Sequence, residues 1–179
     1  WQVPGTAELR SDLVTRASAT LDKLAADPIA SDALLLDLAE AYIRLSEITA
    51  HEVGDFSGST RPLRRARQML DRLERPDAPE ASMLDAHLRL RWRRDVSGED
   101  AVDKSAAAAA PILQQMLALE PVAASDGRYW RWRAEMHGYY ARRLKASGAS
   151  DERVVATQLQ AISDAERALQ LDPGDLLAR

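Results

Sequence analysis

The stretch Ala161-Ile162-Ser163-Asp164-Ala165-Glu166-Arg167-Ala168-Leu169-Gln170-Leu171-Asp172-Pro173 decides the fold class of this chain. Its alanines at positions 161, 165 and 168 share one face of a helix, and Pro173 ends that helix. A face of small side chains allows a second helix to approach closely, because the distance between helix axes depends on the side chains at the contact. The stretch therefore predicts paired helices that stack on one another.

The composition narrows the possible classes of function. The chain has 179 residues, of which 46% are hydrophobic and 5% aromatic, and its net charge is −4. The acidic balance gives no reason to expect nucleic-acid binding. The absence of cysteine excludes disulfides, thiolate nucleophiles and cysteine-ligated metals. No apolar run is long enough to predict a membrane span.

Apolar residues recur at intervals of three and four along most of the chain, which predicts an all-α protein. We expect about seven helices in a single domain over residues 1–179. The expected parts are a linker at 1–5, a leading helix at 7–26, and helix hairpins at 31–75, 79–121 and 126–173. Pro111 follows five alanines, and we expect it to kink or break its helix.

The hairpins have features of a repeat. The prolines that close them, Pro79, Pro121 and Pro173, are 42 and 52 residues apart. Repeats of about 20–50 residues indicate stacked helical units, although these two periods are unequal and longer than the roughly 34 residues of a tetratricopeptide unit. Leu35, Leu38-Ala39 and Tyr42 have the spacing of the first helix of a tetratricopeptide repeat, and Ala161 to Pro173 has that of the second. The chain thus resembles tetratricopeptide-repeat proteins. That resemblance implies an α-solenoid of stacked antiparallel hairpins with a groove for a peptide or protein partner.

A narrower resemblance rests on Leu21-Asp22-Lys23-Leu24-Ala25 and on the run from Leu38 to Leu45. These segments are similar to the helical-repeat region that follows the kinase domain in bacterial membrane-anchored Ser/Thr protein kinases. Similar regions follow winged-helix domains in some bacterial regulators. The resemblance implies that the chain is part of a larger signalling protein, either extracytoplasmic or cytoplasmic. No kinase motif is present, so no catalytic residue is implied.

Local catalytic and metal-binding motifs are missing. The three histidines, His51, His87 and His137, are isolated in sequence, and none lies in a His-Glu-x-x-His pattern. We therefore expect surface or groove-lining histidines, no metal, no cofactor and no enzymatic activity. A Ser-His-Asp triad assembles in space and is not excluded by sequence.

Arginines cluster with aromatic residues at two places, around Trp92 and around Trp130. Arginine binds carboxylates and phosphates through paired hydrogen bonds, so such a cluster suits an acidic or phosphorylated peptide. The more ordinary interpretation is that these arginines cover helix surfaces and pair with acidic residues. The candidate partner-binding residues are Arg89, Arg93, Tyr129, Trp132 and His137.

Three functional hypotheses follow. The first is a non-catalytic interaction module that binds a peptide or protein in a groove. The second is a small-molecule-sensing helical domain, or an enzyme with a pocket between helices near Trp130 and Tyr140. The third is self-association as a homodimer through the apolar Leu176-Leu177 end.

Overall fold

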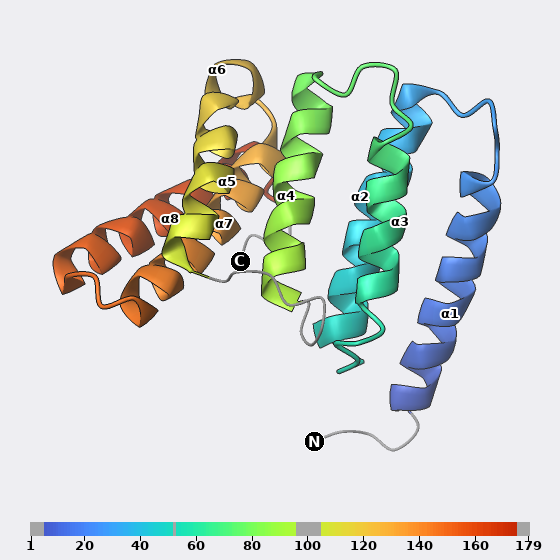
Figure 1. The fold of residues 1–179 in the computed structure, drawn as a ribbon, viewed down its shortest axis with the longest axis horizontal. Coiled ribbons are helices and arrows are strands. Elements are labelled where there is room, and N and C mark those ends of the chain that lie inside the picture. Colours follow the sequence, from blue (N-terminus) through green and yellow to red (C-terminus); the bar gives the residue numbers. More distant parts are fainter. Residues whose placement is uncertain (1–5, 52, 96–104, 175–179) are drawn as a thin grey trace. The chain divides into compact units, whose positions relative to one another are not determined.

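The computed structural model describes residues 6–51, 53–95 and 105–174 and confirms the all-α prediction. These residues form eight helices and no strand (Figure 1). The helices are α1 (Thr6–Ala25), α2 (Asp32–His51), α3 (Thr60–Leu70), α4 (Pro79–Asp95), α5 (Ala106–Ala118), α6 (Glu120–Ala123), α7 (Gly127–Ala146) and α8 (Asp151–Leu171). No described helix combines the length and the apolar character that crossing a bilayer requires.

The chain divides into two compact units, Trp1–Val102 and Asp103–Arg179. The boundary lies inside the range 79–121 that we predicted as one hairpin, so α4 and α5 belong to different units. The prediction took Pro79 and Pro121 as the ends of one repeat. Prolines indicate where helices begin and end, but they carry no information about which helices pack together.

The first unit is organised around α2, which packs against α1, α3 and α4 (Figure 1). Its apolar stripe is fully buried and includes Leu35, Leu38, Tyr42 and Ile43. Helix α3 buries one face on α2 and also packs against α4. The apolar residues of α3 recur every three to four positions and therefore share one face, which leaves its arginines on the opposite face.

The second unit is dominated by the pairing of α7 with α8, while α5 packs on α7. The small-residue face of α8 lies against α7 as predicted, and Ala168 is buried there. A Cβ atom added at Gly127, where α7 begins, would lie 3.4 Å from the Asp172 Cβ, so the two helix ends approach closely. Gly148 has a φ of +76°, which glycine adopts without strain, and it closes the short turn between α7 and α8.

Helix α5 continues through Pro111, so the break that we considered there does not occur. Pro111 is the sixth residue of α5 and removes one hydrogen bond, the one that the Ala107 carbonyl would otherwise accept. Both residues are exposed, so water is available to that carbonyl. Ser105 caps the helix by accepting a hydrogen bond from the Ala108 N–H at 3.1 Å, which stabilises the first turn.

Two features predicted from sequence lie outside the described residues. They are the linker at 1–5 and the apolar pair Leu176-Leu177, on which the self-association hypothesis depends.

Candidate functional site

A pocket of about 420 Å³ opens between α3 and α4 in the first unit. Its lining combines four arginine side chains with the apolar surfaces of Leu88 and Trp92 and contains no carboxylate. The lining residues are Arg64, Arg67, Gln68, Leu88, Arg89, Trp92 and Arg93. This arrangement is suited to a ligand that is both negatively charged and partly apolar.

The spacing of residues on each helix explains the pocket. Arg64, Arg67 and Gln68 lie at positions i, i+3 and i+4 of α3, so they share the face opposite its buried stripe. On α4, Arg89 is followed by Trp92 and Arg93 at the same intervals. Because α3 packs on α4, the two faces form opposing walls of one pocket.

Two carboxylates beside the pocket hold part of this charge. Asp85 lies one turn before Arg89 on α4, and its carboxylate is 2.6 Å from Arg67 and 3.8 Å from Arg89. Asp71 is 4.0 Å from Arg67 and largely exposed. Asp85 therefore orients two of the four guanidinium groups, and no carboxylate is among the residues that line the pocket itself.

Arg93 differs from the arginines that Asp85 orients. Its side chain is half-buried, and its Nε atom is buried without a hydrogen-bond partner among the described residues. A buried donor that lacks an acceptor destabilises the protein by about 1–3 kcal/mol. Because the Nε atom of Arg93 is buried, it would gain an acceptor from an anion in the pocket only if the Arg93 side chain moved toward that anion.

The chain matches no protein-family model, and neither a curated protein nor a solved structure shows significant similarity to it.

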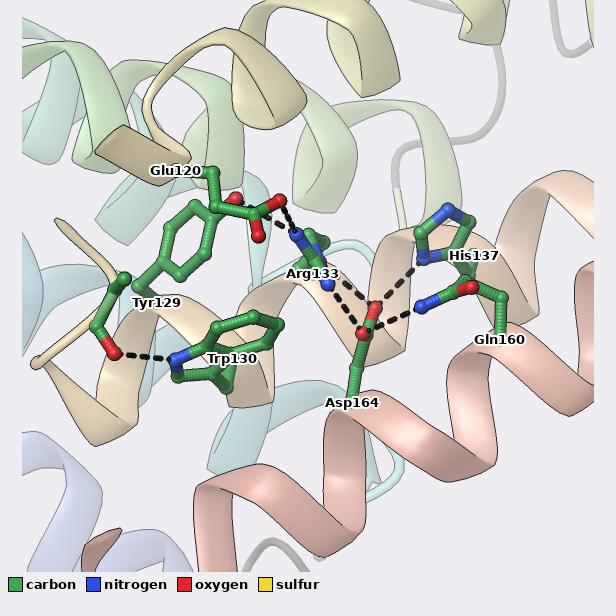
Figure 2. Close-up of polar contacts among 8 residues, drawn as sticks. Glu120, Tyr129, Trp130, Arg133, His137, Gln160 and Asp164 are labelled. Atoms are coloured by element: carbon green, nitrogen blue, oxygen red, sulfur yellow. Dashed lines mark hydrogen bonds and ion pairs between the residues drawn. The ribbon is translucent and has the colours of Figure 1, made fainter. Parts of the chain in front are cut away.

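The second unit contains a different polar cluster, which is buried between α7 and α8 (Figure 2). Asp164 lies at its centre and accepts two hydrogen bonds from Arg133, at 2.6 Å and 2.9 Å. Gln160 donates to the same carboxylate at 2.9 Å, and the Nδ1 atom of His137 is also 2.9 Å from it. Asp164 and Arg133 are only 1% and 4% exposed, so this is a buried ion pair.

Arg133 is satisfied from several sides in the same cluster. It donates to Glu120 at 2.6 Å and to the Tyr129 hydroxyl at 3.0 Å. Its guanidinium carbon lies 4.1 Å from the centre of the Trp130 ring, which adds a cation–π contact. Figure 2 shows Glu120, Tyr129, Arg133, His137, Gln160 and Asp164 joined by hydrogen bonds, so these polar groups mostly satisfy one another, with Glu120 half exposed at the edge.

The pKa values agree with a stable ion pair. Burial alone would raise the pKa of Asp164, but the hydrogen bonds from its three neighbours outweigh burial and hold that pKa below its usual range. Burial alone would lower the pKa of Arg133, and its hydrogen bond to Asp164 raises that pKa instead. Since Asp164 is ionised and only accepts hydrogen bonds, the Nδ1 atom of His137 is the donor in their contact.

The structure separates the five candidate residues into two groups. Arg89 and Arg93 lie together in the pocket of the first unit. Tyr129 and His137 are buried in the Asp164 network of the second unit, and Trp132 is 2% exposed. The last three therefore contribute to the interior, and the expectation of groove-lining side chains does not describe them.

Sequence reasoning also missed residues of the pocket. Arg64, Arg67 and Trp92 line the pocket but were not among the candidate residues chosen from the sequence. The signal was present as an arginine repeated at i and i+3 on α3 and an Arg-x-x-Trp-Arg pattern on α4. What the sequence lacked was the information that α3 and α4 are neighbours.

Other arginines of the third helix region have structural roles. Arg61 and Arg65 are 3.1 Å and 3.3 Å from the carboxylate of Asp22 on α1. Arg72 donates to the backbone carbonyls of Ala25 at 2.7 Å and of Asp27 at 2.6 Å, which closes the end of α1. These three arginines therefore hold α1 and its C-terminal end to the α3 region, and none of them lines the pocket between α3 and α4.

No metal site can be built within either unit taken by itself from the residues that the structure describes. In the first unit, His87 lies 3.8 Å from Glu47, which is also 3.4 Å from Arg91. A neighbouring arginine competes with a cation for the same carboxylate, and Glu47 forms an ion pair with Arg91 here.

Proposed function

We propose that the chain is a non-catalytic interaction module that binds an acidic segment of a protein partner in the pocket between α3 and α4. The observation that carries the proposal is a lining of four arginines and no carboxylate above an apolar base. Arginine and tryptophan are enriched at the energetic centres of protein interfaces, where a pocket excludes water.

We further propose that the helices form a tetratricopeptide-like scaffold within a larger bacterial signalling protein. The residues that carry the resemblance on α2, among them Leu35, Leu38 and Tyr42, are all buried, as a stacked repeat requires. The close pairing of α7 with α8 along a small-residue face also supports this proposal.

A titration of the full chain with a labelled acidic peptide tests the binding function. The probe is a fluorescein-labelled peptide that alternates Glu with Leu, followed by fluorescence anisotropy. Replacing Arg89 or Arg93 with Ala should weaken binding about tenfold, because a hydrogen bond to a charged group contributes about 1.5–3 kcal/mol. Arg44→Ala is the matched control, since Arg44 is exposed on α2 outside the pocket.

The result that contradicts the proposal is equal affinity in the Arg93→Ala, Arg44→Ala and unaltered chains. Raising the salt concentration should also weaken binding to the unaltered chain, because the attraction is electrostatic and partly screened.

A small anionic molecule is the second candidate ligand, because the pocket volume lies within the range of small-molecule sites. A small-molecule sensor would bind such an anion tightly and the peptide only weakly. The comparison of both ligands in one titration series decides between a peptide-binding module and a sensor.

A further inference from the structure

We infer that the pocket between α3 and α4 takes a phosphorylated side chain of its partner, with the dianionic phosphoryl group among the arginines and an apolar stem on Leu88 and Trp92. This inference rests on the proposed function and makes it more specific. An ordinary acidic segment would offer a carboxylate, which has one negative charge and lies in one plane. The charge, the geometry and the base of the pocket each favour the phosphoryl group.

The arginines that line the pocket favour a ligand with two negative charges. Four arginine side chains line the pocket, and Asp85 and Asp71 beside it offset part of their charge. A single carboxylate carries one negative charge, whereas a phosphomonoester carries about two at neutral pH. Because like charges held in a partly desolvated pocket repel one another, a dianion relieves this repulsion more than a monoanion does.

The arginines come from two opposing walls of the pocket, which favours a ligand with oxygens on several sides. Arg64 and Arg67 approach from α3, and Arg89 and Arg93 approach from α4. A phosphoryl group presents three terminal oxygens in a tetrahedral arrangement, so guanidinium groups from two sides can each bind it. A carboxylate has two oxygens in one plane and satisfies fewer of these donors.

The base of the pocket identifies the stem. Leu88 is 2% exposed and Trp92 is half-buried, so the ligand meets apolar surface beneath the arginines. A volume of about 420 Å³ exceeds what a phosphoryl group alone would fill. An aromatic stem would stack on the Trp92 ring, which makes a phosphorylated tyrosine the best match among phosphorylated side chains.

Isothermal titration of the full chain with three small probes tests the inference. Phenyl phosphate supplies the stem and a dianion, benzenesulfonate supplies the same stem and a monoanion, and inorganic phosphate supplies no stem. At pH 7.5 phenyl phosphate should bind about tenfold more tightly than benzenesulfonate, because it carries a second charge and accepts stronger hydrogen bonds. It should also bind more tightly than inorganic phosphate.

The pH dependence separates charge from shape. The second pKa of a phosphomonoester is about 6, so the preference for phenyl phosphate over benzenesulfonate should largely disappear at pH 5. The arginines stay charged throughout this range. The sulfonate does not titrate there, so its affinity reports any change in the protein over the same pH range.

Variants at Arg93 and a control variant at Arg44 separate a loss of binding from a loss of folding. Arg93→Gln should reduce phenyl phosphate binding about tenfold, Arg93→Lys should retain part of it, and Arg44→Gln should leave it unchanged. Helix content measured by circular dichroism verifies that each variant is folded. Loss of binding in Arg93→Gln with intact helix content supports the assignment, and unchanged binding in that variant overturns it.

The failures of the two proposals are distinguishable. Equal binding of phenyl phosphate and benzenesulfonate at pH 7.5 overturns the phosphoryl inference, while arginine-dependent binding of the acidic peptide would still support the binding module. Equal binding of inorganic and phenyl phosphate overturns the role of the stem. If no probe binds and the acidic peptide is indifferent to Arg93, both proposals are wrong.

Discussion

Replacing Arg133 with Met should destabilise the second unit by about 3 kcal/mol, because it leaves the Asp164 carboxylate buried without its main partner. The change removes hydrogen bonds at 2.6 Å and 2.9 Å to Asp164 and one at 3.0 Å to Tyr129. It also removes the stacking on Trp130. Breaking a buried pair by removing one partner costs about 3–5 kcal/mol. The lower end applies, because Gln160 and His137 still donate to Asp164.

Hydrogen exchange of the full chain, followed by mass spectrometry, measures this loss by region. A change of 3 kcal/mol corresponds to roughly a hundredfold faster exchange of the amides that open with the unit. The most protected amides of α7 and α8 should show it. Amides of α2, in the first unit, provide an internal control and should be little affected.

A double variant tests whether the loss of stability comes from the unpaired Asp164 carboxylate. Combining Arg133→Met with Asp164→Leu removes both charges, and replacing a buried ion pair by apolar groups is often close to neutral. The double variant should therefore lose less stability than Arg133→Met alone. A single-variant loss below about 1 kcal/mol, or a double-variant loss larger than the single, would show that the pair does not stabilise the unit as we describe.

Three further predictions concern single positions. The pKa of Asp164 is lowered in the folded state. The ionised carboxylate therefore stabilises the fold fully above the unfolded pKa of about 4, and this stabilisation is lost as the pH falls through the folded pKa. Acid unfolding followed by circular dichroism should be less pH-dependent in Asp164→Asn. Pro111→Ala should raise stability by about 1 kcal/mol, because it restores a helix hydrogen bond, and a lowered melting temperature would contradict this. Gly148→Ala should cost about 1 kcal/mol in urea unfolding, since its φ of +76° is unfavourable for alanine while no atom obstructs the Cβ.

Much of the local structure could be predicted from the sequence. The helical period identified the long helices, because burying one face of a helix requires apolar residues every three to four positions. The alanines of α8 also predicted its close approach to another helix, and Ala168 is buried in that contact. Both features are local, so the residues that determine them are neighbours in sequence.

Features that depend on pairing between distant segments were not predicted. Asp164 lies three residues after Ala161 and one before Ala165, so it shares the small-residue face that packs on α7. A charged residue on such a face requires a buried partner, and Arg133 with His137 one turn later supplies it. This signal was available but was not used, which is why His137 was assigned to a groove.

The pocket was predicted only in part for a similar reason. Arg89 and Arg93 were selected on α4, but half of the positive charge comes from α3. Which arginines face a ligand and which pair internally depends on the neighbouring helix. Arg61 and Arg65 face Asp22 of α1, whereas Arg64 lies between them in sequence and lines the pocket.

The most direct test of the central claim is a nuclear magnetic resonance titration that follows the four tryptophan indole N–H signals of the full chain as the acidic peptide is added. Trp92 is in the pocket, whereas Trp130 donates its indole N–H to the Ala124 carbonyl and Trp132 is buried in the second unit. A Trp92→Phe variant assigns the signal. We predict that the Trp92 signal shifts in a saturable manner and that this shift is abolished by Arg93→Ala. A saturable shift confined to Trp130 or Trp132, with Trp92 unchanged, would contradict the account.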